Sequence, residues 1–258
     1  MHLPSELLTA STSIITGAVS VSALGYSGAR IKSGFSGITK EKVARIAVAG
    51  VAVFGLQMLN FIVPGFSAVS GGVSGHIIGA ILLSLIVGEF PAVFVMAGIL
   101  LTQSVFFADG GLSAIGANLL NMGVIPCLVI FPLIVKPFMN KSPLAASAGI
   151  IAGSVLTAAL GAFAVVAETA VSGTLPFAEF FAPMMVVHLV IGLCEGAATA
   201  VIILAVKFLP KFLPDKKIRM KYALAVLATA AVFAVSPLAS AAPDGLEWSV
   251  AQVRDAGV

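Results

Sequence analysis

The residue types that could do chemistry gather at the first two positions of the chain. A free amino terminus followed at once by histidine offers three nitrogens: the terminal amine of Met1, the deprotonated amide of His2 and one imidazole nitrogen. These donors can hold one cation in two fused chelate rings. Planar nitrogen ligation suits Ni²⁺ and Cu²⁺, and tolerates Co²⁺, better than it suits Mg²⁺ or Ca²⁺. The opposing interpretation is that His2 is a chance residue at a frayed terminus.

Composition places these residues in a membrane protein. Of the 258 residues, 59% are hydrophobic and 10% are charged, whereas a soluble domain carries roughly 25% charged residues. Long uncharged apolar runs predict an all-α, polytopic protein that crosses the lipid bilayer about seven or eight times. The net charge of +3 does not indicate nucleic-acid binding, because the basic residues serve topology. The two cysteines, Cys127 and Cys194, lie in apolar runs and are interpreted as packing residues.

Eight apolar segments are expected to form the transmembrane helices, with boundaries good to a few residues. The third and fourth are short for the roughly 20 residues of a perpendicular span. A tight turn at residues 88–91 separates these two, so both are expected to be partly sunk against neighbouring helices. The eight segments are 8–28, 43–63, 75–88, 91–108, 119–136, 144–167, 180–206 and 222–241.

The basic residues orient these segments in the membrane. If all eight cross, every Lys and Arg except Arg254 falls on one side, in the loops near residues 30–45, 136–141 and 207–221. The positive-inside rule makes that side the cytoplasm. The N-terminus then faces outward, and so does the loop that leads to His76. This agreement follows from charge and does not presuppose a metal site.

Two loops on the external side are rich in Gly and Ser and run directly into apolar segments. They are residues 64–76, which end at His76, and residues 109–118. Irregular backbone at membrane depth is tolerated only where protein or water covers its polar groups. A polar loop ending in a histidine is expensive to bury without a purpose. The two loops therefore predict a packed site that opens outward, with two flexible loops as the alternative.

Several short motifs, taken together, resemble those of one family. Residues 1–4 (MHLP) resemble the MHIP start of the CbiM/NikM substrate-capture subunits of energy-coupling-factor metal transporters. The resemblance covers nearly all of residues 1–209, which are taken as a metal-capture membrane domain. One departure is Ser5-Glu6, where the family usually has Asp-Gly. Residues 57–65, 74–79, 107–112, 116–123 and 188–196 are similar, in that order, to the family's QMLNFPVPG, SGHLLG, FADGGL, GANxxNMG and HxxIGxxEG elements.

The resemblance implies a metal site formed by Met1, His2 and the histidine of the SGH element, here His76. His76 would supply the fourth nitrogen of a near-square-planar site for Ni²⁺ or Co²⁺, the cargo of the transporter. Because the donors must be unprotonated, uptake is expected to fall as pH drops through the histidine range. Several polar side chains could orient the rings, although helix capping or bridging of buried backbone explains them equally well. These candidates are Asn60, Ser70, Ser74, Asp109 and Asn118.

His188 and Glu195 lie seven residues apart in one apolar segment. Two helical turns, about 10.5 Å of rise, place them on one face of a helix. Ionisable residues within the membrane suggest an ion pathway or a contact with a partner subunit. The alternative, which we favour, is a satisfied core histidine and a hydrogen-bond clamp between helices, next to small residues such as Gly192 and Gly196.

Residues 210–258 form a second unit of the sequence. A basic stretch, expected to be a cytoplasmic linker, leads to the last apolar segment and then to residues 243–248 (PDGLEW). This hexapeptide resembles an element of the small NikN/CbiN-type subunits, which implies that part of such a subunit is fused behind the main domain. The second membrane helix usual in that subunit does not follow before Val258. An ordinary eighth helix with a polar external tail is the alternative.

The sequence contains no Walker A glycine loop, so no ATP site is expected in this chain. The resemblance implies partners: a transmembrane coupling subunit of CbiQ/NikQ type and two cytoplasmic ATPases of CbiO/NikO type. A separate small subunit of NikN/CbiN type is a further candidate, which would supply what the fused part lacks. We interpret the chain as the non-catalytic, substrate-binding subunit of a Ni²⁺ or Co²⁺ importer in a bacterial or archaeal cytoplasmic (inner) membrane. The alternatives are a stand-alone secondary transporter with Glu195 on its ion route and, less favoured, a metal-dependent membrane enzyme with Asp109 as base. The choice between nickel and cobalt stays open.

Overall fold

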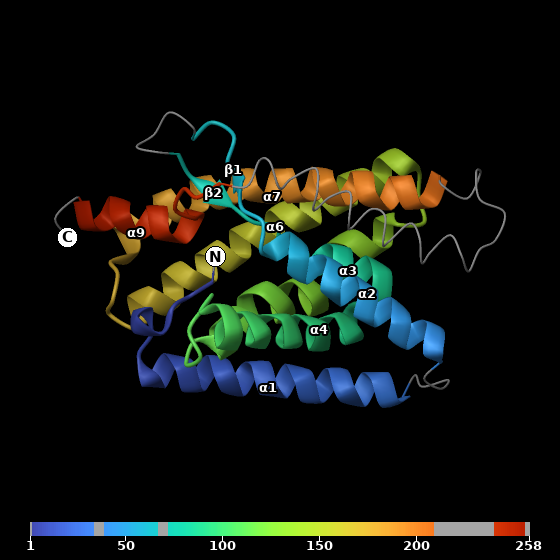
Figure 1. The fold of residues 1–258 in the computed structure, drawn as a ribbon, viewed down its shortest axis with the longest axis horizontal. Coiled ribbons are helices and arrows are strands. Elements are labelled where there is room, and N and C mark those ends of the chain that lie inside the picture. The colour runs from blue at the N-terminus through green and yellow to red at the C-terminus, as the bar shows by residue number, and fades with distance from the viewer. Residues whose placement is uncertain (1, 34–38, 67–71, 209–239, 256–258) are drawn as a thin grey trace.

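The computed structural model describes residues 2–33, 39–66, 72–208 and 240–255. These residues form an all-α bundle with one small hairpin, as predicted. Helices α1 (Ala10–Ser33) and α7 (Phe177–Phe208) lie on opposite sides of the bundle, and α3 (Ala80–Val87) and α4 (Glu89–Thr102) lie between them (Figure 1). The predicted segment 222–241 falls almost wholly outside the described residues.

Four stretches of the described residues are long and apolar enough to cross a membrane. They correspond to the fourth to seventh predicted segments. The number of spans, predicted as seven or eight, and the outward position of the N-terminus stay predictions. The four stretches are Glu89–Phe107, Ile115–Phe138, Pro143–Val171 and Phe177–Ala205.

The third apolar segment is a short buried helix, as expected from its length. Helix α3 covers only eight residues, and the side chains of Ala80 to Ser84 are all buried. The expectation that helix begins at Gly75 is wrong, because residues 75–79 form strand and loop. A break at Gly88 separates α3 from α4, as predicted, but the predicted turn over residues 88–91 is too long, because α4 already begins at Glu89. The loop before α3 therefore lies inside the bundle, where it positions His76.

The predicted helix over residues 43–63 is wrong at its end. Helix α2 (Lys40–Gln57) is followed by strand β1 (Phe61–Ile62), which pairs antiparallel with β2 (Ser74–Gly75). A short apolar run does not distinguish a strand from a buried helix by its periodicity. Here packing favours the strand, because Val63 joins a buried cluster with Val73, Val187 and Ile191 at α7.

The second external loop also lies between helices of the bundle. Helix α4 continues as a π-helical turn, Gln103–Phe107, before the loop begins. Helix α5 (Ile115–Leu119) then runs into a π-helix, Leu120–Val135, that contains Pro126 and Pro132. Proline has no N–H to donate, so it interrupts the regular α-helical pattern. The two loops predicted to form the site thus lead into α3 and α5.

Helix α7 packs closely along α6 (Pro143–Val171) through glycines. A methyl group added at Gly192 would lie 2.8 Å from Cα of Val155, and one at Gly196 would lie 2.7 Å from Cα of Ile151. Small residues allow helix backbones to approach in this way. The C-terminal helix α9 (Gly245–Asp255) packs against α7 as well. His188 and Glu195 therefore lie on a helix that packs against both α6 and α9.

Candidate metal-capture site

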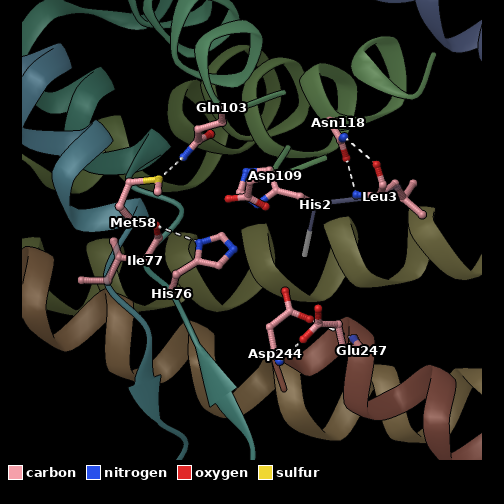
Figure 2. Close-up of polar contacts among 10 residues, drawn as sticks. All are labelled: His2, Leu3, Met58, His76, Ile77, Gln103, Asp109, Asn118, Asp244 and Glu247. Carbon is pink, nitrogen blue, oxygen red and sulfur yellow. Dashed lines mark hydrogen bonds and ion pairs between the residues drawn. The ribbon is translucent and has the colours of Figure 1, made fainter. Parts of the chain in front are cut away.

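The structure brings together the two histidines that the sequence selected. The rings of His2 and His76 are stacked, with 4.9 Å between centroids and 18° between planes. Both side chains are buried, at 7% and 6% exposure. Figure 2 shows them between the loop that carries Asp109 and the C-terminal segment that carries Asp244. Met1, the remaining predicted ligand, lies outside the described residues.

Side chains alone do not complete a metal site around this pair. Within residues 2–33, 39–66, 72–208 and 240–255, no three His, Cys, Asp or Glu side chains are grouped so as to hold an ion. A cation at the stacked pair would need further donors from the backbone or the chain terminus.

Asp109 is the charged neighbour of the pair. Its Oδ1 lies 3.1 Å from Nδ1 of His2 (Figure 2). Burial opposes ionisation of Asp109, but the hydrogen bond from His2 and the attraction of both histidines keep its pKa below the ordinary value. The other ring nitrogen of His2, Nε2, is buried and has no hydrogen-bond partner among the described residues. Asp109 thus contributes negative charge next to the His2 ring of the pair.

The residues that follow His2 are held by the loop before α5. The amide of Leu3 donates to Oδ1 of Asn118 at 2.7 Å, and Nδ2 of Asn118 donates to the carbonyl of Leu3 at 3.0 Å. The amide of Gly111 donates to the same carbonyl at 2.9 Å. A methyl group added at Gly111 would lie only 2.2 Å from the Ser5 nitrogen. Asn118 therefore fixes the backbone next to His2 and does not contact a ring, and Gly111 permits the close approach.

The loop that carries His76 is held by Glu195. The amides of Ile78 and Gly79 donate to Oε2 and Oε1 of Glu195, each at 2.9 Å. Gln57 donates to the carbonyl of Ile78 at 2.6 Å. Gly79 adopts φ of +74°, a conformation that favours glycine. The clamp predicted for Glu195 is thus present in the geometry, and it joins α7 to the loop of His76.

Burial sets the charge state of His76. Desolvation, together with the positive charge of the amino terminus and His2, lowers the pKa of His76 to about 3. Its Nδ1 lies 3.4 Å from the Ile77 carbonyl, which is a long contact. His76 is therefore neutral at physiological pH, and a neutral imidazole is the form that binds a metal.

The C-terminal segment reaches this loop through backbone hydrogen bonds. The amide of Ser74 donates to the carbonyl of Pro243 at 2.9 Å, and its hydroxyl donates to that of Ala242 at 2.7 Å. The carbonyl of Asn60 accepts from the amide of Ser240 at 2.8 Å. Ser74 and Asn60 thus hold the tail segment and do not orient the rings. The remaining candidate of this group, Ser70, lies outside the described residues.

Asp244 is a residue of the site that the sequence interpretation missed. Its side chain accepts from the Glu247 amide at 2.8 Å, while the Asp244 amide donates to Glu247 at 2.9 Å, a reciprocal cap at the start of α9. Burial opposes ionisation of Asp244, but the amino terminus, the Glu247 amide and His76 keep its pKa far below the ordinary value. The Asp-x-x-Glu spacing could have revealed the cap, but not its position beside His76.

His188 is buried at 2% exposure, as expected of a core histidine. Its Nδ1 lies 2.8 Å from the Met184 carbonyl one helical turn earlier. Its Nε2 is buried and has no hydrogen-bond partner among the described residues. Only half of the ring's hydrogen-bonding capacity is therefore satisfied.

Comparison with known proteins gives a consistent result. Residues 2–215 match the family described as CbiM, cobalt uptake substrate-specific transmembrane region. The chain is 31% identical over 257 residues to a protein of Archaeoglobus fulgidus named as a fused nickel transport protein, NikMN. The match covers 96% of the present chain and 79% of that protein. Over 136 residues it is 31% identical to the cobalt transport protein CbiM of Clostridium tetani, with 51% of the chain and 56% of that protein matched.

The fold has a counterpart among solved structures. A crystal structure of a transition metal transporter superposes with a TM-score of 0.64 at 22% identity, covering 86% of this chain and 98% of that one. A truncated transition metal transporter gives a TM-score of 0.62 at 23% identity, with 80% and 98% covered. At these identities the likeness concerns the fold alone.

Proposed function

The chain belongs to the CbiM family of cobalt uptake substrate-specific transmembrane proteins, and on that premise we propose how it works. It is a nickel or cobalt transport protein of the membrane. It is the substrate-binding subunit of an ATP-driven energy-coupling-factor importer, and it captures Ni²⁺ or Co²⁺ from outside the cytoplasmic membrane. Nitrogen donors from Met1, His2 and His76 hold the ion.

The observation that carries this proposal is the stacked, buried pair of His2 and His76. The two residues are far apart in sequence, yet their rings lie 4.9 Å apart in a setting that keeps His76 neutral. Two imidazoles need additional donors to hold a divalent ion firmly. The His2 amide adjoins the pair, and the terminal amine, one residue earlier in the sequence, would supply a further nitrogen. Such donors suit nickel and cobalt.

Capture requires the His2 ring to change partners. Only Nδ1 can close a six-membered chelate ring with the His2 amide nitrogen, and Nδ1 now faces Asp109. The incoming cation would therefore displace Asp109 from Nδ1. Asp109 attracts the ion to the pair and can then accept a hydrogen bond from a ligating group, as carboxylates beside metal-bound histidines do.

The partners follow from the family and the tail. ATP hydrolysis is assigned to two cytoplasmic ATPases of CbiO/NikO type, coupled through a membrane subunit of CbiQ/NikQ type. The match of 257 residues to a fused protein supports a NikN-like C-terminal part in this chain. The hydrogen bonds of Glu195 to two amides of the His76 loop favour a structural clamp over an ion route. They therefore favour the subunit proposal over a stand-alone secondary transporter.

Metal stoichiometry on the purified full-length chain with its native start tests the proposal. One tightly bound Ni²⁺ or Co²⁺ per chain is expected, with loss of tight binding in His2→Ala and in a chain extended by a few residues before Met1. Equal binding by all three proteins would refute the terminal chelate. Uptake by the chain alone in vesicles, without an ATPase, would refute the subunit role and support the secondary transporter.

A further inference from the structure

A small cavity lies next to the stacked pair, on the side of α7 and the C-terminal segment. Its volume is about 10 Å³, room for roughly one water molecule or one ion without its hydration shell. It lies between the loop of His76 and α7, a helix that is long and apolar enough to span the membrane. The cavity is lined by Gly75, His76, Ile78, His188, Ile191, Asp244 and Gly245.

His188 is oriented for ligation. The contact of its Nδ1 with the Met184 carbonyl, at 2.8 Å, places the ring proton on Nδ1 and leaves a lone pair on Nε2. Histidines that bind metals have this arrangement, with the second nitrogen bonded to a carbonyl or carboxylate. Nε2 is buried and without a partner among the described residues, which costs free energy unless something binds there. A ligand at the cavity would satisfy it.

Gly245 keeps the approach to His188 open. A methyl group added there would lie 2.8 Å from Cγ1 of Val187, and 3.1 Å from Cε1 and 3.4 Å from Nε2 of His188. Any side chain at this position would thus crowd the edge of the ring. Asp244, which lines the same cavity, adds negative charge that favours a cation over a neutral ligand.

We propose that His188 is a second ligand for the transported ion, forming with His76 a transfer site that accepts the ion from the terminal chelate. This inference rests on the proposed function. The two imidazoles would be the only side-chain ligands, and water or backbone oxygen would complete the coordination shell. This agrees with the finding that no three metal-binding side chains are grouped together among the described residues. Weak binding is what a transfer step needs, because an ion must be able to leave each site along a path. The ion would keep one ligand, His76, as it exchanges the chelate for His188.

The test uses Co²⁺ as the probe and removes the chelate. In the full-length chain with extra residues before Met1 and His2→Ala, one weakly bound Co²⁺ per chain is expected, with visible d–d absorption of a low-symmetry nitrogen and oxygen site. Adding His188→Gln or Gly245→Ala should weaken this binding roughly tenfold or more. The control Gly25→Ala, where an added methyl group meets nothing within 4 Å, should leave it unchanged.

The outcomes separate the two proposals. Two results on the extended His2→Ala chain would overturn the transfer site: no bound Co²⁺, or Co²⁺ binding that His188→Gln leaves unchanged. Either result leaves the capture site standing, and the cavity then holds water only. No Co²⁺ on the unsubstituted chain with its native start overturns the proposed function itself.

Discussion

The two halves of the candidate site are held in different ways. The segment of His2 is fixed to the loop before α5 by hydrogen bonds of Leu3 with Asn118 and Gly111, all between uncharged groups. The loop of His76 is fixed to α7 by one carboxyl group, Glu195, which accepts from two successive amides. The first half lies near the start of the chain, and its Leu3 is fully buried in the core of the bundle. The second half is bonded to α7 through Glu195 and to α2 through Gln57.

This difference suggests which half responds to each event. Under the proposed function, capture of an ion would involve the N-terminal segment, since His2 would have to release Asp109 for its Nδ1 to bind. Release inward would concern α7, since a partner that shifts this helix would pull the loop of His76 through Glu195. The expectations below test this division, from the largest effect to the smallest.

Removing the Glu195 clamp should have the largest effect. Glu195→Ala leaves two buried amides without acceptors, a cost of about 2–6 kcal/mol in the free energy of unfolding. Glu195→Gln keeps one acceptor and should lose less. Thermal unfolding in detergent measures the change, and titration with Ni²⁺ should show loss of affinity. The matched control is Glu168→Ala on α6, which removes a buried carboxyl group that is bonded to Asn121 and lies outside the site. If Glu168→Ala weakens Ni²⁺ binding as much as Glu195→Ala does, Glu195 does not act as a specific clamp.

A methyl group at Gly111 should expel the N-terminal segment. The added carbon would overlap the Ser5 backbone, and overpacking of this kind costs about 1–3 kcal/mol. We expect Gly111→Ala to weaken Ni²⁺ binding and to lower the melting temperature, because displacing the segment would expose Leu3, which is fully buried in the core. Calorimetric titration measures the affinity. Gly98→Ala in α4, where the methyl group meets open space, should bind as the unsubstituted chain does; unchanged affinity in Gly111→Ala would show that the segment need not lie there.

Asn118→Ala should weaken binding by about tenfold, the lower end of the range for groups that orient ligands. It removes both hydrogen bonds of the side chain to Leu3 but leaves that of Gly111. Asn121→Ala, one helical turn later and bonded to Glu168, is the control. Equal losses of Ni²⁺ affinity in the two variants would contradict a specific role for Asn118.

The smallest effect is expected from pH. His76 takes up a proton at an ordinary pKa of 6.5 when the chain is unfolded, but burial lowers its pKa to about 3 in the folded protein. Between these values the unfolded chain binds more protons, so folding stability falls as pH falls. At about pH 5.5 the loss should be about 1.3 kcal/mol relative to neutral pH. Unfolding of metal-free protein against pH measures it; His76→Asn should lack this component, and an identical slope in that variant would refute the assignment.

Much of the candidate site was predictable because it depends on local sequence. His2 follows the terminal amine directly, and His76 ends a Gly/Ser loop that charge places on the same side. The length of the third apolar segment also predicted that α3 would be short and partly buried against neighbouring helices. It failed at residues 58–63, where a short apolar run was read as helix although its side chains pack as a strand against α7. Periodicity does not record which neighbour a run will meet.

The sequence by itself determined the membrane class, the family motifs and the chemistry of the chain end. Tertiary structure alone decided which backbone groups Glu195 and Asn118 would bind, because their partners lie 117 and 115 residues away. It also decided that Asp244 and His188 would border the cavity beside His76. A hydrogen bond or a metal ligand is defined by distances of about 2–3 Å. Sequence spacing fixes such distances only within a helix or turn, and between remote segments the packing of the bundle sets them.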